Sequence, residues 1–174
     1  MFMNLSEVFT SENGILKAQF SMVGQPVEIA GQKYQAVSEI PIRITATHVS
    51  EGKAHVEGQG AVTYELHCDR CLEIVQHEVV LDFALDVYAP GAVPEDAEAD
   101  GQIYMEGYQL NVKALIDSEI MMQWPMKVLC KPECKGICMK CGKNLNYGEC
   151  GCDTFVPDPR MAAIKDIFNA NKEV

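Results

Sequence analysis

Long apolar stretches and positive charge are both scarce in this sequence. No stretch approaches the roughly 18 consecutive apolar residues that a membrane-spanning helix needs. The N-terminal residues MFMNLSEVFT have no basic residue before their apolar positions and include Glu7, unlike a secretory signal peptide. We therefore expect a cytoplasmic protein without a membrane partner, in a compartment where persistent disulfides are rare.

The common motifs of catalysis are also missing. The sequence contains neither a phosphate-binding loop nor an HExxH metalloprotease motif. Histidine is spread over segments predicted as strands, and none lies in a recognisable nucleophile motif; the residues are His48, His55, His67 and His77. These absences favour a protein that is not an enzyme.

Negative charge dominates but is unevenly distributed. The net charge is −11, and residues 1–126 hold 6 Lys and Arg against 19 Asp and Glu, whereas residues 127–174 hold 8 against 6. We predict an acidic β-rich domain over 1–126, with one helix near its end, and a cysteine-rich tail with a C-terminal helix over 127–174. The acidic part suits either a plain soluble surface or the binding of a basic protein, because it repels nucleic acid.

Alternating hydrophobicity predicts that the acidic part is mostly β-sheet. Residues 54–68 and 79–87 alternate between apolar and polar with a period of two, which is typical of half-buried strands. These strands flank CDRC, which places Cys68 and Cys71 near the tip of a hairpin. Shorter strands are expected at 15–23, 26–30, 33–37 and 40–49, with a tight turn at Gly31. The predicted fold class is α+β, a mostly antiparallel sheet or partial barrel with a few helices and a small zinc-knuckle tail.

Turn and cap residues divide the remainder of the chain. The proline- and glycine-containing stretch 89–102 predicts a mobile loop. Asn111 can cap a helix over 112–123, which Pro125 ends by disfavouring helix at the preceding residue. Asp158 is a good cap for a last short helix.

Cysteine is concentrated near the C-terminal end of the sequence. Residues 127–157 are too few and too polar to bury a core, and segments of this size usually need a disulfide or a metal. Cys138-Met-Lys-Cys141-Gly142 has the form of a metal knuckle, because the glycine lets backbone N–H groups turn toward the sulfurs. A second pair follows, and zinc favours four such soft ligands. We call Cys138, Cys141, Cys150 and Cys152 the tail tetrad and predict that it binds zinc.

The other four cysteines also form two close pairs. We call Cys68, Cys71, Cys130 and Cys134 the split tetrad, a possible second zinc site that would tie the hairpin tip to the start of the tail. Two alternatives stay open at this point, two zinc sites or one site plus free thiols. The alternation places Cys68 on the apolar face of its strand, where a free cysteine is common.

Two other cysteine chemistries fit the sequence less well. The spacing Cys134-x3-Cys138-x2-Cys141 matches the cluster-binding pattern of radical S-adenosylmethionine enzymes, whose motif precedes a partial α/β barrel. Only 33 residues follow Cys141, too few for that barrel. A dithiol redox centre at Cys68 and Cys71 would normally open a helix, whereas this pair joins two predicted strands.

Lysines alternate with the tail cysteines and have two interpretations. An ion of charge +2 held by four thiolates carries a net negative charge that nearby cations offset. The same lysines could instead face RNA phosphates. The residues predicted to contact RNA or a protein partner are Lys127, Lys131, Lys135, Lys140, Lys143 and Arg160.

The order of these motifs resembles a known family. CDRCL after a strand, then WPMKVLC, then CKGICMKCGKNLNYGECGC, then DPR are similar to the YceD-type family of large ribosomal RNA subunit accumulation proteins. The resemblance covers roughly residues 40–170 and implies a role in producing large-subunit ribosomal RNA and assembling that subunit. Met139 stands where proline is usual in the family. The resemblance implies no defined reaction, and the tail cysteines are not kept by every member.

Together these observations predict a non-enzymatic factor in biogenesis of the large ribosomal subunit. Its expected partner is a basic ribosomal protein or a pre-ribosomal particle, bound by the acidic domain. The alternatives are a zinc-dependent RNA-binding module that acts through the lysine-rich tail, and a thiol redox protein.

Overall fold

The computed structural model describes residues 1–94 and 100–152, which divide into two compact units. The first unit consists of residues 1–67 and 74–128. The second consists of the hairpin loop 68–73 and, among the described residues, of 129–152.

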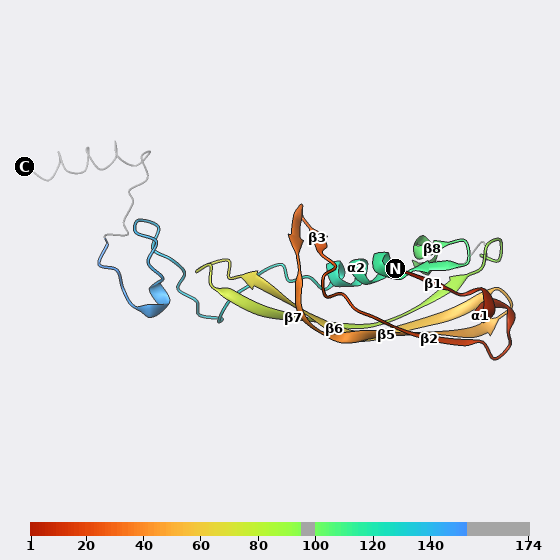
Figure 1. Cartoon of the computed structure of the whole chain (residues 1–174). Coiled ribbons are helices and arrows are strands. Elements are labelled where there is room, and N and C mark those ends of the chain that lie inside the picture. The colour runs from red at the N-terminus through yellow and green to blue at the C-terminus, as the bar shows by residue number, and fades with distance from the viewer. Residues whose placement is uncertain (95–99, 153–174) are drawn as a thin grey trace, which may run out of the picture. The chain divides into compact units, whose positions relative to one another are not determined.

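A four-stranded antiparallel sheet forms the main part of the first unit (Figure 1). The strands lie in the order β2 (Ile15–Phe20), β5 (Ala36–Ser50), β6 (Lys53–His67) and β7 (Ile74–Tyr88). This confirms the predicted antiparallel architecture. The sheet does not close into a barrel, because β2 and β7 each have only one neighbouring strand.

Two small sheets and two α-helices accompany the main sheet. One small sheet joins β1 (Phe2–Asn4), β9 (Gln109–Asn111) and β8 (Met105–Glu106), and the other pairs β3 (Val27–Ile29) with β4 (Gln32–Tyr34). The helices of the first unit are α1 (Ser6–Thr10) and α2 (Val112–Met122), with a 3₁₀ turn η1 (Asp100–Tyr104); a further 3₁₀ turn, η2 (Leu145–Tyr147), belongs to the second unit. β3 and β4 meet at Ala30 and Gly31, both with positive φ, which confirms the tight turn expected at Gly31.

The strand β5 is longer than the sequence pattern predicted. Two separate strands were expected over 33–37 and 40–49, but the structure runs one strand through most of this region. Its pairing with β6 shifts register between Ile40 and Arg43, so that Pro41 and Ile42 lie opposite the single residue Gly60. A bulge of this kind accommodates proline, which has no N–H for the strand ladder.

The core lies on one face of the main sheet, as the alternation predicted. Strand β6 buries Val56, Val62 and Tyr64 on this face, while Glu57 and Glu65 on the opposite face are exposed. Helix α2 contributes buried apolar residues to the same cluster. Its predicted cap is confirmed, since Asn111 Oδ1 accepts a hydrogen bond of 3.1 Å from the backbone N–H of Ala114.

Some elements lay beyond the reach of the sequence pattern. The short β1 and α1 carry too few residues for a period to show, and they were not predicted. The last helix and Arg160 fall within 153–174, outside the described residues. None of the helices in the described ranges is long and apolar enough to cross a membrane.

Adding one methyl group at Gly58 is expected to destabilise the first unit. A Cβ at this position would overlap the ring of Phe83, which faces it from β7 and is 8% exposed. Overpacking of this kind costs about 1–3 kcal/mol. Urea unfolding of Gly58→Ala, followed by fluorescence of the single tryptophan, Trp124, should show this loss. In a Phe83→Leu background the same methyl should cost less; an equal cost in both backgrounds would contradict the proposed clash.

Candidate metal centres

The second unit brings all eight cysteines together in two groups of four. Within the split tetrad and within the tail tetrad, all four sulfurs lie within 4.8 Å of one another. All eight cysteines are free thiols. The structure therefore brings together the same two groups of four cysteines that the sequence suggested. The sequence had left open whether the chain has two metal sites or one site plus free thiols.

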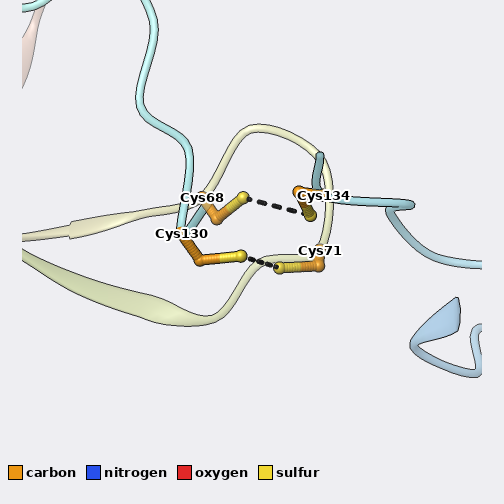
Figure 2. A group of neighbouring side chains, drawn as sticks. All are labelled: Cys68, Cys71, Cys130 and Cys134. Carbon is orange, nitrogen blue, oxygen red and sulfur yellow. Dashed lines mark hydrogen bonds between the residues drawn. The ribbon is translucent and has the colours of Figure 1, made fainter. Parts of the chain in front are cut away.

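Sulfur spacing in the split tetrad suits one tetrahedral ion. Cys68 Sγ lies 3.8 Å from Cys134 Sγ, and Cys71 Sγ lies 3.5 Å from Cys130 Sγ (Figure 2). A tetrahedral ion with metal–sulfur bonds of about 2.3 Å separates its ligands by roughly 3.8 Å. The ligands of a multi-iron cluster bind different irons and must stand further apart. A single metal ion that favours soft ligands therefore fits this geometry best.

The two Cys-x-x-Cys segments have the same backbone hydrogen bonds. In the tail tetrad, Gly142 N donates to Cys138 O over 2.8 Å, and Cys138 N donates to Lys143 O over 2.9 Å. In the hairpin loop, Leu72 N donates to Cys68 O over 2.9 Å, and Cys68 N donates to Glu73 O over 2.8 Å. The loop between β6 and β7 is therefore a second knuckle, built on the same turn.

Leu72 occupies the position that glycine holds in the other knuckle. Its φ is 62°, close to the 72° of Gly142. A left-handed conformation costs a residue with a Cβ roughly 1–2 kcal/mol, so the surrounding contacts must hold it there. Glycine after the second cysteine is the sequence signal of a knuckle, and CDRCL has no glycine at that position.

Backbone N–H groups and neighbouring sulfurs set the charge of the split tetrad. Burial acts to raise the pKa of Cys68, but hydrogen bonds from the backbone N–H groups of Arg70, Cys130 and Cys71 bring it down to about 6. The Asn146 side chain, which donates to Cys134 Sγ, is the main cause of the lowered pKa of Cys134. For Cys71, the N–H of Glu73 favours the thiolate, yet burial and the adjacent sulfurs raise the pKa to about 12.

The tail tetrad likewise contains one thiol with a lowered pKa and another with a raised pKa. Backbone N–H groups of Cys141 and Lys140 lower the pKa of Cys138 to about 6, as expected for a knuckle. Hydrogen bonds with Cys141 and Cys150 raise the pKa of Cys152 to about 12. In each tetrad, ionisation of one thiol thus makes ionisation of its neighbours less favourable. A divalent cation would stabilise all four thiolates together, and its binding would release protons.

Several residues around the split tetrad make interactions that the cysteine spacing does not predict. Arg70 Nη1 donates to Cys134 O over 2.8 Å, and Asn146 Nδ2 donates to Cys134 Sγ over 3.2 Å. The Tyr147 hydroxyl donates to Glu73 Oε1 over 2.5 Å. Asn146 and Tyr147 belong to the NLNY run of the motif CKGICMKCGKNLNYGECGC. Their place inside this motif was the available signal of a role.

The predicted contact lysines do not all belong to one unit. Lys127 lies in the first unit, whereas Lys131, Lys135, Lys140 and Lys143 lie in the second and are exposed. Lys143 Nζ donates to Glu149 O over 2.9 Å. Lys131, Lys135 and Lys140 have no side-chain hydrogen bond or ion pair within residues 1–94 and 100–152.

Residues 56–168 match the profile of the family described as large ribosomal RNA subunit accumulation protein YceD. The matched range includes every cysteine of both tetrads. This chain belongs to the YceD family. The resemblance predicted from CDRCL and the tail motif is thereby confirmed, and the family's description names a role in ribosomal RNA accumulation without naming a reaction.

Curated relatives of this YceD-family chain add no function. Uncharacterized proteins of Mycobacterium bovis and Mycobacterium tuberculosis are 29% identical to it over 141 residues, covering 79% of this chain. The chain spans 65% of the length of these relatives. No solved structure is significantly similar to it.

The two tetrads are expected to hold two metal ions per chain. Elemental analysis of the purified protein should give about two zinc ions, and substituting Cys71 and Cys130 by serine should leave about one, because each closed site needs its four thiolates. The matched pair Cys141→Ser and Cys150→Ser should also leave about one. A protein that contains a single ion, and keeps it after loss of Cys71 and Cys130, would show that the split tetrad is not a metal site.

Proposed function

We propose that this chain is a non-enzymatic factor that supports accumulation of large-subunit ribosomal RNA in the cytoplasm, with a second unit held together by two zinc ions. Membership of the YceD family is the observation that carries the role. The fit of two sulfur tetrads to tetrahedral ions supports the zinc. In this proposal Cys68, Cys71, Cys130 and Cys134 hold one ion, and Cys138, Cys141, Cys150 and Cys152 hold the other.

Zinc supplies the stability that the second unit cannot obtain from a hydrophobic core. Four of the buried residues in its described part are the cysteines Cys68, Cys71, Cys134 and Cys138, while Met139 and Tyr147 are 92% and 75% exposed. A structural zinc ion contributes apparent folding free energies of about 10–16 kcal/mol. Zinc supplies no chemistry in this proposal beyond binding the thiolates and fixing the chain around them.

Charge favours a basic protein as the partner of the first unit. By sequence, residues 1–67 and 74–128 contain 17 acidic and 6 basic side chains. The second unit contains 8 of each, and two ions held by thiolates alone would add about four negative charges. Its lysines are thus first needed to offset the metal sites, which weakens the case for a strongly cationic RNA-binding tail.

The exposed face of β6 and β7 offers a surface for such a partner. Strand pairing places Glu65, Glu78 and Asp82 on this face, and all three side chains are exposed. An apolar row crosses the same face, in which Ile40 and Val80 are 58% and 55% exposed and flank Ala61. Carboxylates around apolar side chains suit a protein surface that is both basic and partly apolar.

One observation favours RNA contact as the second candidate function. Lys131, Lys135 and Lys140 are exposed and make no ion pair in the described part of the chain. Free lysines of this kind can neutralise phosphates, and the resulting affinity falls steeply with salt concentration.

Loss of the chain should lower the amount of large-subunit ribosomal RNA relative to small-subunit ribosomal RNA in the cells that produce it. The wild-type sequence should restore the ratio, whereas the Cys71→Ser and Cys130→Ser variant should not, because its second unit lacks one metal site. Quantitative RNA analysis measures both species in one sample. An unchanged ratio in cells without the chain would contradict the proposed role.

Neutralising the acidic face should reduce association with large-subunit precursors more than neutralising the free lysines. The compared variants are Glu65→Gln, Glu78→Gln and Asp82→Asn together, and Lys131→Gln, Lys135→Gln and Lys140→Gln together. Each removes three exposed charges, so they are matched controls, and co-sedimentation at two salt concentrations measures the outcome. If only the lysine variant loses association, and with it the salt dependence, RNA contact replaces the protein partner as the better account.

A further inference from the structure

The run Asn144 to Tyr147 lies between the two cysteine pairs of the tail tetrad, but it also contacts the segments that carry the cysteines of the split tetrad. Leu145 N donates to Gly136 O over 2.9 Å. Asn146 makes two hydrogen bonds with the neighbouring segment, donating from Nδ2 to Cys134 Sγ over 3.2 Å and accepting at Oδ1 from Lys135 N over 2.9 Å. One side chain therefore binds a sulfur of the split tetrad and fixes the backbone beside it.

Tyr147 extends these contacts to the hairpin loop. Its hydroxyl donates to Glu73 Oε1 over 2.5 Å, and Glu73 Oε2 lies 3.6 Å from Cys71 Sγ. The run thus reaches both chain segments that supply the split tetrad, the loop 68–73 and the stretch 130–134. These contacts lie within the second unit, as do both tetrads.

The two cysteine pairs of the tail tetrad enclose the run in the sequence. Residues 142–149 connect Cys141 to Cys150, so a metal ion bound by this tetrad closes a short loop. No residue of η2 is buried, so little apolar packing holds the loop in shape. Its internal order comes from polar contacts, among them Asn144 Oδ1 accepting from Asn146 N over 2.9 Å and Lys143 Nζ donating to Glu149 O over 2.9 Å.

We propose that the two metal sites of the second unit are coupled through Asn146, which acts as a positioning residue for the split tetrad. Metal in the tail tetrad closes the loop that presents Asn146 to Cys134, and so raises the metal affinity of the split tetrad. By linkage, metal in the split tetrad raises the affinity of the tail tetrad by the same factor. This inference relies on the proposed function only in taking both tetrads as metal sites.

Hydrogen bonds to metal ligands set the expected size of the effect. Loss of such an outer partner typically lowers metal affinity by about 10–100-fold. The amide of Asn146 bonds the sulfur directly and also orders Lys135, the residue next to that ligand. We therefore expect Asn146→Leu, which keeps the approximate size of the side chain but has no donor or acceptor, to weaken zinc binding at the split tetrad within this range.

The experiment measures zinc affinity by competition with a chromophoric chelator, using the full chain with one tetrad disabled at a time. With Cys71 and Cys130 replaced by serine, only the tail tetrad is measured, and Asn146→Leu should leave its affinity unchanged. With Cys141 and Cys150 replaced by serine, the split tetrad should bind zinc about 10–100-fold more weakly than in the intact chain. Asn146→Leu should then add little, because the loop is no longer closed.

Two further measurements keep a folding defect apart from a loss of coupling. Asn13→Leu makes the same substitution at an exposed turn of the first unit and should change neither affinity. Fluorescence of Trp124, whose ring contacts those of Tyr34 and Tyr64 in the first unit, should be unchanged in every variant. If the wild-type chain and the Asn146→Leu variant both bind two zinc ions with the same affinities, the proposed coupling is wrong, although both tetrads are metal sites. If the wild-type chain holds none, both the coupling and the zinc of the proposed function are wrong.

Discussion

The grouping of eight cysteine sulfurs into two tetrads is the feature around which the second unit is built. Its described part has few buried apolar side chains, and its most buried residues include the cysteines themselves. Backbone N–H groups are already turned toward Cys68 and Cys138, which lowers the pKa of both to about 6. The chain thus provides the geometry and part of the charge stabilisation, and a cation would complete it.

The first unit is stabilised by a hydrophobic core. A sheet with one apolar face, covered by α2 and smaller elements, buries a contiguous core that includes residues from β5, β6 and β7. Its opposite face remains free for carboxylates and an exposed apolar row. The knuckle at 68–73 lies in the chain between β6 and β7, so one hairpin contributes strands to the sheet and two cysteines to the split tetrad. The range matched by the YceD family includes β6, β7 and all eight cysteines, and this hairpin belongs to both the sheet and the cysteine groups.

Residue periodicity was enough to predict the sheet and α2, because alternation over 54–68 and the cap at Asn111 are local properties. It could not predict β1 and α1, which are too short to show a period, nor the continuity of β5 through a proline bulge. Cysteine spacing indicated the same two groups of four sulfurs that the structure brings together, but it left the number of metal sites open, because residues 68–71 and 130–134 meet only through long-range contacts. The roles of Leu72 and Asn146 depend on backbone angle and on a contact between distant segments, and spacing carries no information about either.

Hydrogen exchange before and after exhaustive chelation is the decisive measurement, because it reports on both units in the same sample. If thiolate coordination holds the second unit together, backbone amides of residues 68–73 and 129–152 should lose their protection when the metal is removed, while those of β5, β6 and α2 should keep theirs. Undiminished protection of the Cys138 and Leu145 amides in a metal-free chain would contradict it.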